Sequence, residues 1–375
     1  MAGRLDFTTL NPPQREAVDH SGTPLLVLAG AGSGKTRVIT YRIARLLFDR
    51  IKAERILGVT FTNKAAREMR ERMSGLVGRR GRDVHLSTFH SLGLTIVKED
   101  YATVGLRRGF AIYDTSDQMS LLRELMRRVR VADRRLDTYK VLEKILATKR
   151  KRLDEVQIDW GDDYEFAAYE LYPRYREQMK AYNAVDFDDL ILLASDILSE
   201  PGKALKWSNR YDHILVDEYQ DTSPDQLDLL RVLAGEGQNL CVVGDDDQSI
   251  YAWRGAAVDN ILSFANHFRG AREVVLDQNY RSTSNILRAA NAVIANNAAR
   301  KEKSLWSASG DGEPVEVVGC GGAEDEAEFV AHTIHRMVYE GHKFDEFAVL
   351  YRSNTQNKVL EETMLLEKIP YRIVG

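Results

Sequence analysis

The sequence predicts an α/β fold in which helices cover a parallel sheet. The run PLLVLAG at residues 24–30 is apolar and ends in glycine, as a buried parallel strand does. It is followed at 36–48 by TRVITYRIARLLF, whose apolar side chains fall on one side of a helix. ILGVTF at 56–61 and KAAREMRERM at 64–73 repeat this strand-then-helix order. Strands that alternate with helices along a chain favour a parallel sheet.

Two later apolar runs extend the same pattern after a long helical stretch. HILVDE at 213–218 and LCVVGD at 240–245 are typical of buried strands. Before them, strand-like runs give way to amphipathic segments such as SDQMSLLRELMRRVR at 116–130. We therefore expect an all-helical subdomain, over residues 92–185, inserted into the α/β domain.

A second α/β pattern begins at about residue 277. EPVEVVGC at 313–320 and FAVLYRS at 347–353 have the composition of strands, and EDEAEFVAHTIHRMV at 324–338 has helical spacing. The chain of 375 residues is too long for one ordinary core. The predicted domains are residues 1–91 with 186–276, residues 92–185, and residues 277–375.

The composition excludes several classes of protein. No apolar run approaches the roughly 20 residues of a membrane span, so we expect no membrane partner. Cys241 and Cys320 are too few for a disulfide framework and lack metal-ligand spacing, which fits a cytoplasmic location. The formal net charge is −4, so an anionic partner would be bound by local patches of positive charge.

AGAGSGKT follows the first predicted strand and opens the first predicted helix, the context that a phosphate-binding loop needs. Its glycines let backbone N–H groups point at phosphate oxygens, where the helix N-terminus adds positive potential. Lys35 would contact the β- and γ-phosphates, and the Thr36 hydroxyl would bind Mg²⁺. A chance glycine-rich turn is the alternative. The residues assigned to the loop are Ala29, Gly30, Ala31, Gly32, Ser33, Gly34, Lys35 and Thr36.

Paired carboxylates stand at the end of the third predicted strand, in ILVDEYQDT. Asp217 can bind Mg²⁺ through water, and Glu218 can polarise the attacking water. Such pairs are also common turn residues, but the preceding phosphate loop favours the catalytic interpretation. Arg281, in QNYRS of the second domain, could stabilise transition-state charge on a γ-phosphate. Its alternative is a surface ion pair.

The stretch VVGDDDQSIYAWRGA at 242–256 combines two kinds of chemistry. Three acids suit a metal ion or a solvated turn, whereas two aromatic residues and an arginine suit a flat, anionic ligand. Gln248 is a neutral group that could hydrogen-bond both a γ-phosphate and a water. We predict that this stretch couples nucleotide to a second ligand. The alternative is that Trp253 is a core aromatic.

In order along the chain, these motifs resemble those of superfamily 1 DNA helicases of the Rep/PcrA/UvrD group, and most closely those of Rep. Further blocks of this resemblance are LNPPQREAV, VTFTNKAAREM, STFHSLG, DFDDLI and AVLYRSN. The resemblance covers essentially the whole chain. It implies a RecA-like P-loop NTPase sheet, a second, incomplete RecA-like domain, and movement 3′ to 5′ along single-stranded DNA driven by ATP with Mg²⁺.

The resemblance also implies roles for individual residues. Gln14 would recognise adenine, and Arg37 and Tyr280 would sandwich its ring. Lys35, Glu218, Gln248 and Arg281 would be the catalytic residues, with Glu218 as the base and Arg281 as the arginine finger, while Thr36 and Asp217 would bind Mg²⁺. The DNA path would follow Phe61, Asn63, Thr88, His90, Phe187, Tyr251, Trp253 and Arg254. Phe61 and Phe187 could instead be core residues, and His90 an ordinary surface histidine.

Two downstream motifs of the family do not occur before Gly375. We therefore expect the N-terminal part of a longer helicase, inactive alone, that acts on single-stranded DNA and on junctions of single and double strands. One rival is a helicase-like subunit of a nuclease complex. Another is a non-catalytic, ATP-gated DNA-binding module, against which the intact Lys35, Asp217, Glu218 and Gln248 argue. The sequence identifies no protein partner.

Overall fold

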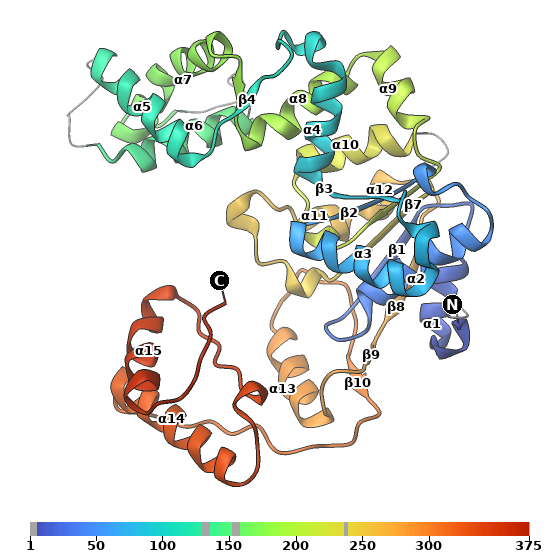
Figure 1. Cartoon of the computed structure of the whole chain (residues 1–375), viewed down its shortest axis with the longest axis vertical. Helices are drawn as coiled ribbons and strands as arrows, with labels where there is room; N and C mark the ends of the chain where they lie inside the picture. The colour runs from blue at the N-terminus through green and yellow to red at the C-terminus, as the bar shows by residue number, and fades with distance from the viewer. Residues whose placement is uncertain (1–5, 130–135, 152–157, 236–238, 375) are drawn as a thin grey trace. The chain divides into compact units, whose positions relative to one another are not determined.

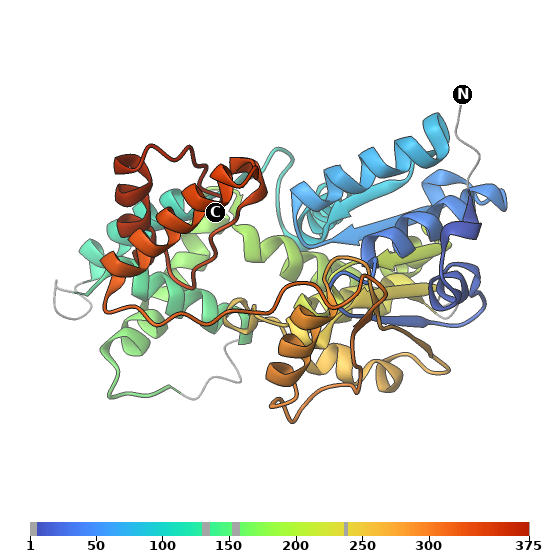
Figure 2. The ribbon, with the colours of Figure 1, turned by 90° about the horizontal axis from the view of Figure 1, so that it is seen from below.

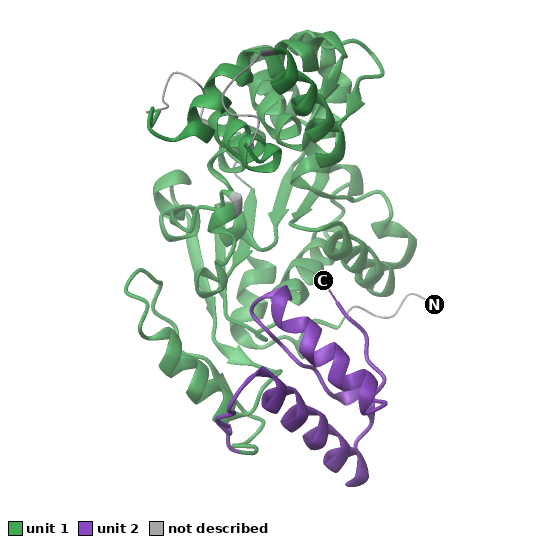
Figure 3. Ribbon diagram, turned by 90° about the vertical axis from the view of Figure 1, so that its left-hand side faces the viewer, with its two compact units in different colours: residues 1–313 green, residues 314–375 purple. Residues whose placement is uncertain are grey.

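The computed structural model describes residues 6–129, 136–151, 158–235 and 239–374. The chain forms two compact units, residues 1–313 and 314–375, which Figure 3 distinguishes by colour. None of the described helices is both long and apolar enough to span a membrane.

In the described residues, a parallel sheet of six strands forms the centre of the first unit (Figure 1). Strand β1 pairs with β7 on one side, where Leu25 lies opposite Cys241, and with the edge strand β8 on the other, where Leu25 lies opposite Arg272. This arrangement confirms the predicted α/β fold with a parallel sheet. In spatial order the strands are β3 His85–Thr88, β2 Ile56–Thr60, β6 His213–Val216, β7 Leu240–Gly244, β1 Leu25–Ala29 and β8 Arg272–Leu276.

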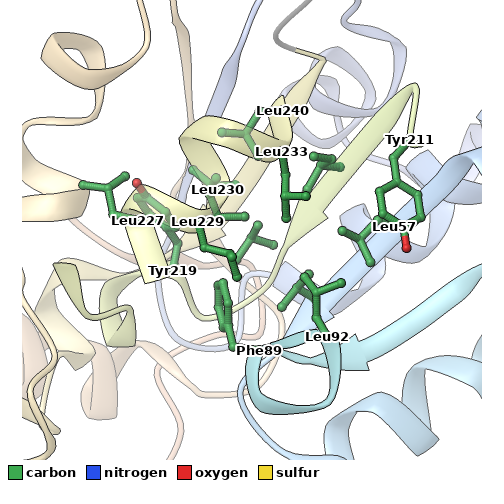
Figure 4. Close-up of a cluster of buried hydrophobic side chains, with 14 of the residues drawn as sticks. Leu57, Phe89, Leu92, Tyr211, Tyr219, Leu227, Leu229, Leu230, Leu233 and Leu240 are labelled. Atoms are coloured by element: carbon green, nitrogen blue, oxygen red, sulfur yellow. The ribbon is translucent and has the colours of Figure 1, made fainter. Parts of the chain in front are cut away.

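Helices cover both faces of this sheet, because successive strand side chains point to opposite faces. On β1, Leu25 and Val27 belong to one buried cluster, whereas Leu26 and Leu28 belong to another. Helices α1, α2 and α3 pack in the first cluster, and α4, α8, α9, α10 and α12 pack in the second, part of which is drawn in Figure 4. The bounds are α1 Pro12–Asp19, α2 Lys35–Phe48, α3 Asn63–Val77, α4 Phe89–Asp100, α8 Phe187–Leu198, α9 Pro201–Ser208, α10 Pro224–Ala234, α11 Asp259–Leu262 and α12 Phe264–His267.

Between α4 and α8, the described residues include three α-helices that build a hydrophobic core of their own. Leu122, Val141 and Leu171 are fully buried there, one from each helix. Figures 1 and 2 show this group of helices from two directions. A short ladder of β4 with β5 closes the group where the chain enters and leaves it. The bounds are α5 Thr115–Val129, α6 Thr138–Lys151, α7 Asp163–Ala181, β4 Ala111–Ile112 and β5 Ala184–Val185.

After β8 the first unit ends with a two-stranded ladder and one helix: β9 Gln278–Asn279, β10 Trp306–Ser307 and α13 Ser284–Ile294. The second unit contains α14 Ala323–Tyr339 and α15 Asn357–Leu366 around a small core. The strands predicted at 313–320 and 347–353 are wrong, because neither segment forms a ladder with any described residue. Val317 and Leu350, 95% and 93% exposed, show why: apolar sequence favours a strand only where a neighbouring strand supplies hydrogen bonds and cover.

Candidate functional site

The predicted site residues gather at one edge of the sheet. All six strands are parallel, so their carboxyl ends share that edge, where open α/β folds bind ligands. Gly30 follows β1, Phe61 follows β2, Asp217 follows β6 and Asp245 follows β7, while Thr88 is the last residue of β3. The topology therefore brings motifs far apart in sequence to neighbouring positions.

The loop between β1 and α2 has the backbone that a phosphate cradle requires. Gly32 and Gly34 have φ values of 68° and 92°, a left-handed conformation that glycine adopts without strain. The Ser33 hydroxyl donates to the Gly30 carbonyl at 2.7 Å, which closes the loop on itself. A side chain at Gly32 would place its Cβ 2.5 Å from Asn279 Nδ2, so the loop has no room for one. Ala29, Ala31 and Thr36 flank this cradle, and Lys35 begins α2.

Lys35 is the most informative residue of the loop. Its Nζ atom is buried and makes no hydrogen bond with any described residue, although it lies 3.4 Å from Glu218 Oε2. A buried ammonium group without a hydrogen bond is costly, so the position is suited to an anionic ligand that accepts from it. Glu218 has φ 51°, which costs a non-glycine residue about 1–2 kcal/mol. Backbone strain of this kind clusters at functional sites.

The positive charge of Lys35 does not fully compensate for the burial and mutual repulsion of the carboxylates around it. Burial, together with the charge of Glu218, raises the pKa of Asp217 to about 7, which the Lys35 ammonium only partly opposes. Burial and Glu218 likewise raise the pKa of Asp221 to about 6. One Asp221 oxygen is buried without a hydrogen bond to any described residue. A divalent cation held near Asp217 and Thr36 would relieve this repulsion, so the residues present fit Mg²⁺.

Gln220, which the sequence reasoning missed, joins two motifs of the site. Its Nε2 donates to Glu218 Oε2 at 2.9 Å, and its Oε1 accepts from the backbone N–H of Asp245 at 2.9 Å. The side chain is 2% exposed. Glu218 is thus tied through one amide to the end of β7. The motif DEYQDT contains this glutamine, but nothing in the sequence indicates its partner 25 residues away.

The predicted adenine-binding residues lie beside the phosphate loop. Gln14 is buried and donates from Nε2 to the Ser33 carbonyl at 2.9 Å. Arg37 donates to the Thr9 hydroxyl at 2.6 Å. The Tyr280 hydroxyl accepts from Asn11 Nδ2 at 2.9 Å. The structure thus holds Arg37 and Tyr280 by different partners and shows no stacked pair of these two side chains.

The segment with Arg281 lies directly against the phosphate loop. Asn279 Nδ2 donates to the Ala31 carbonyl at 2.6 Å, and the Tyr280 N–H donates to the Gly32 carbonyl at 3.0 Å. Asn279 Oδ1 also accepts from the Arg281 N–H at 2.8 Å. The Arg281 Cβ is 2.9 Å from the position that a Cβ on Gly32 would take. Arg281 therefore stands where its guanidinium group can serve the same ligand as the loop.

The acidic triplet Asp245, Asp246 and Asp247 surrounds a lysine ammonium group. Carboxylate oxygens of the three residues lie within 4.8 Å of one another, a spacing that could hold a metal ion. Lys303 Nζ instead lies 3.1 Å, 2.6 Å and 2.7 Å from their oxygens. Gln248 donates from Nε2 to Asp245 Oδ2. The sequence reasoning missed Lys303, and no local signal indicates a partner 56 to 58 positions away.

Aromatic side chains also lie beside the carboxyl ends of strands β2 and β3. The rings of Phe61 and Tyr251 are stacked at 5.3 Å and 24°, and Trp253 lies 6.3 Å from Tyr251. His90 and Phe187 form a second pair, 6.2 Å apart at 70°. Phe187 is 52% exposed and Trp253 is 71% exposed, so neither is a core residue.

The other residues of the predicted DNA path have simpler surroundings. Thr88 is the N-cap of α4, where its hydroxyl accepts from the Ser91 N–H at 3.2 Å. Asn63 is exposed at the start of α3. Burial lowers the pKa of His90, which keeps the imidazole neutral at pH 7. The side chain of Arg254 lies outside the described part of the structure.

Two family descriptions match the chain. "UvrD/REP helicase N-terminal domain" matches residues 10–269. "UvrD-like helicase C-terminal domain" matches residues 274–375.

Curated proteins that are similar to the chain are also named as helicases. The chain is 42% identical over 370 residues to proteins named ATP-dependent DNA helicase PcrA, from Staphylococcus epidermidis and from Staphylococcus aureus. The match covers 98% of this chain and 51% of each relative. The chain thus spans about half the length of the curated relatives it matches.

Proposed function

Because the chain belongs to the UvrD/REP helicase family, we propose that it contains the ATP site and part of the DNA path of an ATP-dependent DNA helicase that moves 3′ to 5′ on single-stranded DNA. The observation that carries this proposal is the buried Lys35 ammonium, which has no hydrogen bond in the described structure and faces Glu218 across the phosphate loop. In the complex, the γ-phosphate accepts from Lys35 and replaces the missing partner.

Thr36 and Asp217 hold Mg²⁺ in this proposal. When bound, the ion neutralises charge on the phosphates. Burial and the charge of Glu218 raise the pKa of Asp217 to about 7, so a bound cation would favour the ionised form of this carboxyl group.

Glu218 accepts the proton of the attacking water, and the bond from Gln220 holds its carboxylate in place. Gln248, anchored on Asp245, contacts the γ-phosphate, and Arg281 donates to it as charge develops in the transition state.

The nucleotide base binds beyond the loop in this proposal. Gln14 donates from Nε2 to the Ser33 carbonyl and accepts at Oε1 from the Asn11 N–H, so its second amide N–H and a lone pair of Oε1 remain for the adenine edge. Arg37 bonds to Thr9 and Tyr280 to Asn11, two residues further along the chain, and in this proposal the two side chains close on the two faces of the ring when ATP enters.

Single-stranded DNA is the proposed second ligand, and junctions of single and double strands are the proposed substrates. Exposed aromatic rings suit a ligand whose bases stack, because every base offers a π-face whatever its identity. Phe187 contacts His90, which follows β3, and Trp253 contacts Tyr251, which stacks on Phe61 after β2, so both exposed rings support a DNA path beside the carboxyl ends of the strands. The formal net charge of −4 leaves attraction of phosphates to local groups such as Arg254.

We further propose the domain division 1–91 with 186–276, 92–185 and 277–375, and a cytoplasmic location. The separate core of α5, α6 and α7 supports the helical subdomain. The two cysteines, Cys241 buried and Cys320 exposed, form no disulfide, as expected in a reducing compartment.

The test is unwinding by the full-length protein of duplexes with a single-stranded tail. With ATP and Mg²⁺, a duplex with a 3′ tail should be separated, and one with a 5′ tail or blunt ends should not. Intact product strands exclude the rival in which the chain serves a nuclease. Unwinding of the 5′-tailed duplex alone, or strand separation without ATP, would refute the proposal.

A further inference from the structure

A short basic segment that contains Arg300 and Lys303 forms ion pairs with the acidic triplet that follows β7. Lys303 is 2% exposed and contacts Asp245, Asp246 and Asp247 at once. Arg300 forms a bidentate pair with Asp247, with Nε to Oδ1 at 2.9 Å and Nη2 to Oδ2 at 2.8 Å. Arg300 also donates to the Lys303 carbonyl at 3.0 Å, which holds the segment together. We call the side chains of Arg300 and Lys303 the latch.

The charges of the latch and the triplet depend on each other. The carboxylates raise the pKa of Lys303 against the opposing effect of burial. Arg300 and Lys303 in turn hold the pKa of Asp247 below its usual value, again against burial. Three neighbouring carboxylates, two of them fully buried, would repel one another without the lysine. The ammonium group therefore fills the space in which a metal ion could otherwise sit.

Asp245 connects the latch to Gln248, because it contacts both Lys303 and Gln248. Its Oδ1 lies 3.1 Å from Lys303 Nζ and accepts from the Asp247 N–H at 3.2 Å. Its Oδ2 accepts from Gln248 Nε2. An ionised carboxylate only accepts hydrogen bonds, so it selects the amide nitrogen of Gln248 and turns the amide oxygen away from itself. Removing the lysine would free Asp245 to rotate and Gln248 with it.

The latch also faces the same cavity as the phosphate loop. A cavity of about 420 Å³ is lined by Ala31 from the loop, by Gln248 and by Lys303. The apolar side of α13 forms another part of its wall, through Ala290 and Ile294. The latch is therefore part of the wall of the site and not a remote surface ion pair.

We propose that Lys303 is a positioning residue for ATP hydrolysis, which acts through Asp245 to orient Gln248 toward the γ-phosphate. This inference rests on the proposed function, since it assigns Gln248 to that phosphate. The three acids that precede the aromatic residues in VVGDDDQSIYAWRGA thereby have a structural role. They anchor the loop between nucleotide and DNA to the segment after α13.

The test compares variants of the full-length protein in steady-state ATP hydrolysis with saturating single-stranded DNA. Lys303→Met removes the charge and keeps the aliphatic stem. Lys301→Met is the matched control, because its ammonium pairs with Glu273 on β8 and not with the triplet. Asp246→Asn combined with Lys303→Met removes one repelling charge together with the lysine. Asp245→Asn is nearly isosteric and weakens the anchor of Gln248 directly.

Lys303→Met should lower kcat on the order of 10- to 100-fold, as a misplaced group about 1 Å from its position does. The KM for ATP and the Kd for single-stranded DNA should stay close to wild type, because the phosphate loop and the aromatic residues are untouched. Asp246→Asn should restore part of kcat in the double variant. A lysine that only stabilises the fold would instead lower the melting temperature and the active fraction, with no separation of kcat from KM.

Wild-type kcat in Lys303→Met, or an equal loss in Lys301→Met, overturns the proposal while leaving the proposed function standing. If Lys303→Met does not fold, Asp245→Asn decides alone: a lower kcat at unchanged KM supports the latch, and wild-type kcat overturns it. A wild-type protein that hydrolyses no ATP with DNA present refutes the proposed function itself.

Discussion

Replacing Trp253 by alanine separates a DNA-stacking role from a structural one. The side chain is 71% exposed. A tryptophan buries at most about 250 Å² when fully packed, so less than a third of that is already removed from water here. At about 25 cal/mol per Å², its loss should cost no more than about 2 kcal/mol of folding free energy. A core tryptophan would cost about 3–5 kcal/mol.

Trp253→Ala should also weaken the binding of single-stranded DNA, separately from its small effect on folding. Stacking of one base on an aromatic side chain is worth about 1–3 kcal/mol, so the Kd for single-stranded DNA should rise about 5- to 150-fold. Unwinding should fall with it. ATP hydrolysis without DNA should change little, because Lys35 and Glu218 are unaffected.

Trp160→Ala is the matched control. Trp160 is 65% exposed, contacts Phe166 and Tyr169 of α7, and is not a residue of the predicted DNA path. A thermal melt, a titration with fluorescent single-stranded DNA and a DNA-free ATPase assay on both variants complete the experiment. A large drop in melting temperature for Trp253→Ala with unchanged DNA affinity per folded molecule would refute the stacking role. Equal losses of DNA affinity in the two variants would also refute it.

Three further outcomes follow from the nucleotide site. Lys35→Ala should lower ATP hydrolysis by orders of magnitude while the melting temperature changes little, as measured by phosphate release and calorimetry. Asp217 has a folded-state pKa of about 7 against an ordinary value of 3.8, so the folded protein binds more protons than the unfolded one between these values. The stability of the nucleotide-free protein should therefore fall as pH rises through that window. Asp217→Asn should make this fall smaller, leaving the part that comes from Asp221, whose pKa is raised to about 6, and should raise the melting temperature at pH 8 while abolishing hydrolysis. Gly32→Ala should weaken ATP binding, measured by titration calorimetry, because its Cβ would meet Asn279 at 2.5 Å and Gly32 has φ 68°.

The parts of the fold that were predictable have a local signal. β1, β6 and β7 are continuous apolar runs with every residue buried except His213, so composition alone identified them. β8 was missed, because Arg272 and Glu273 open it with charged residues that a sheet-edge strand leaves exposed. The segments at 313–320 and 347–353 were wrongly predicted, since apolar composition does not reveal whether a pairing strand exists.

The candidate site divides in the same way. The candidate phosphate loop and Asp217 could be proposed from the sequence, because the residues that suggest their chemistry are consecutive and follow a predicted strand. Lys303 was missed because its role depends on an ion pair with Asp246, 57 positions away, and this ion pair exists only in the folded chain. Gln220 was missed for the same reason, although it stands two residues from Glu218.

The most direct test of the account is ATP binding and hydrolysis by the wild-type protein and by Glu218→Gln, each with and without single-stranded DNA. The substitution removes the proposed base and leaves the candidate phosphate loop, Lys35 and Asp217 in place. We expect that DNA stimulates hydrolysis by the wild type, and that Glu218→Gln binds ATP as tightly yet turns over almost none. Hydrolysis by the wild type that ignores DNA, or normal turnover by Glu218→Gln, would contradict this expectation.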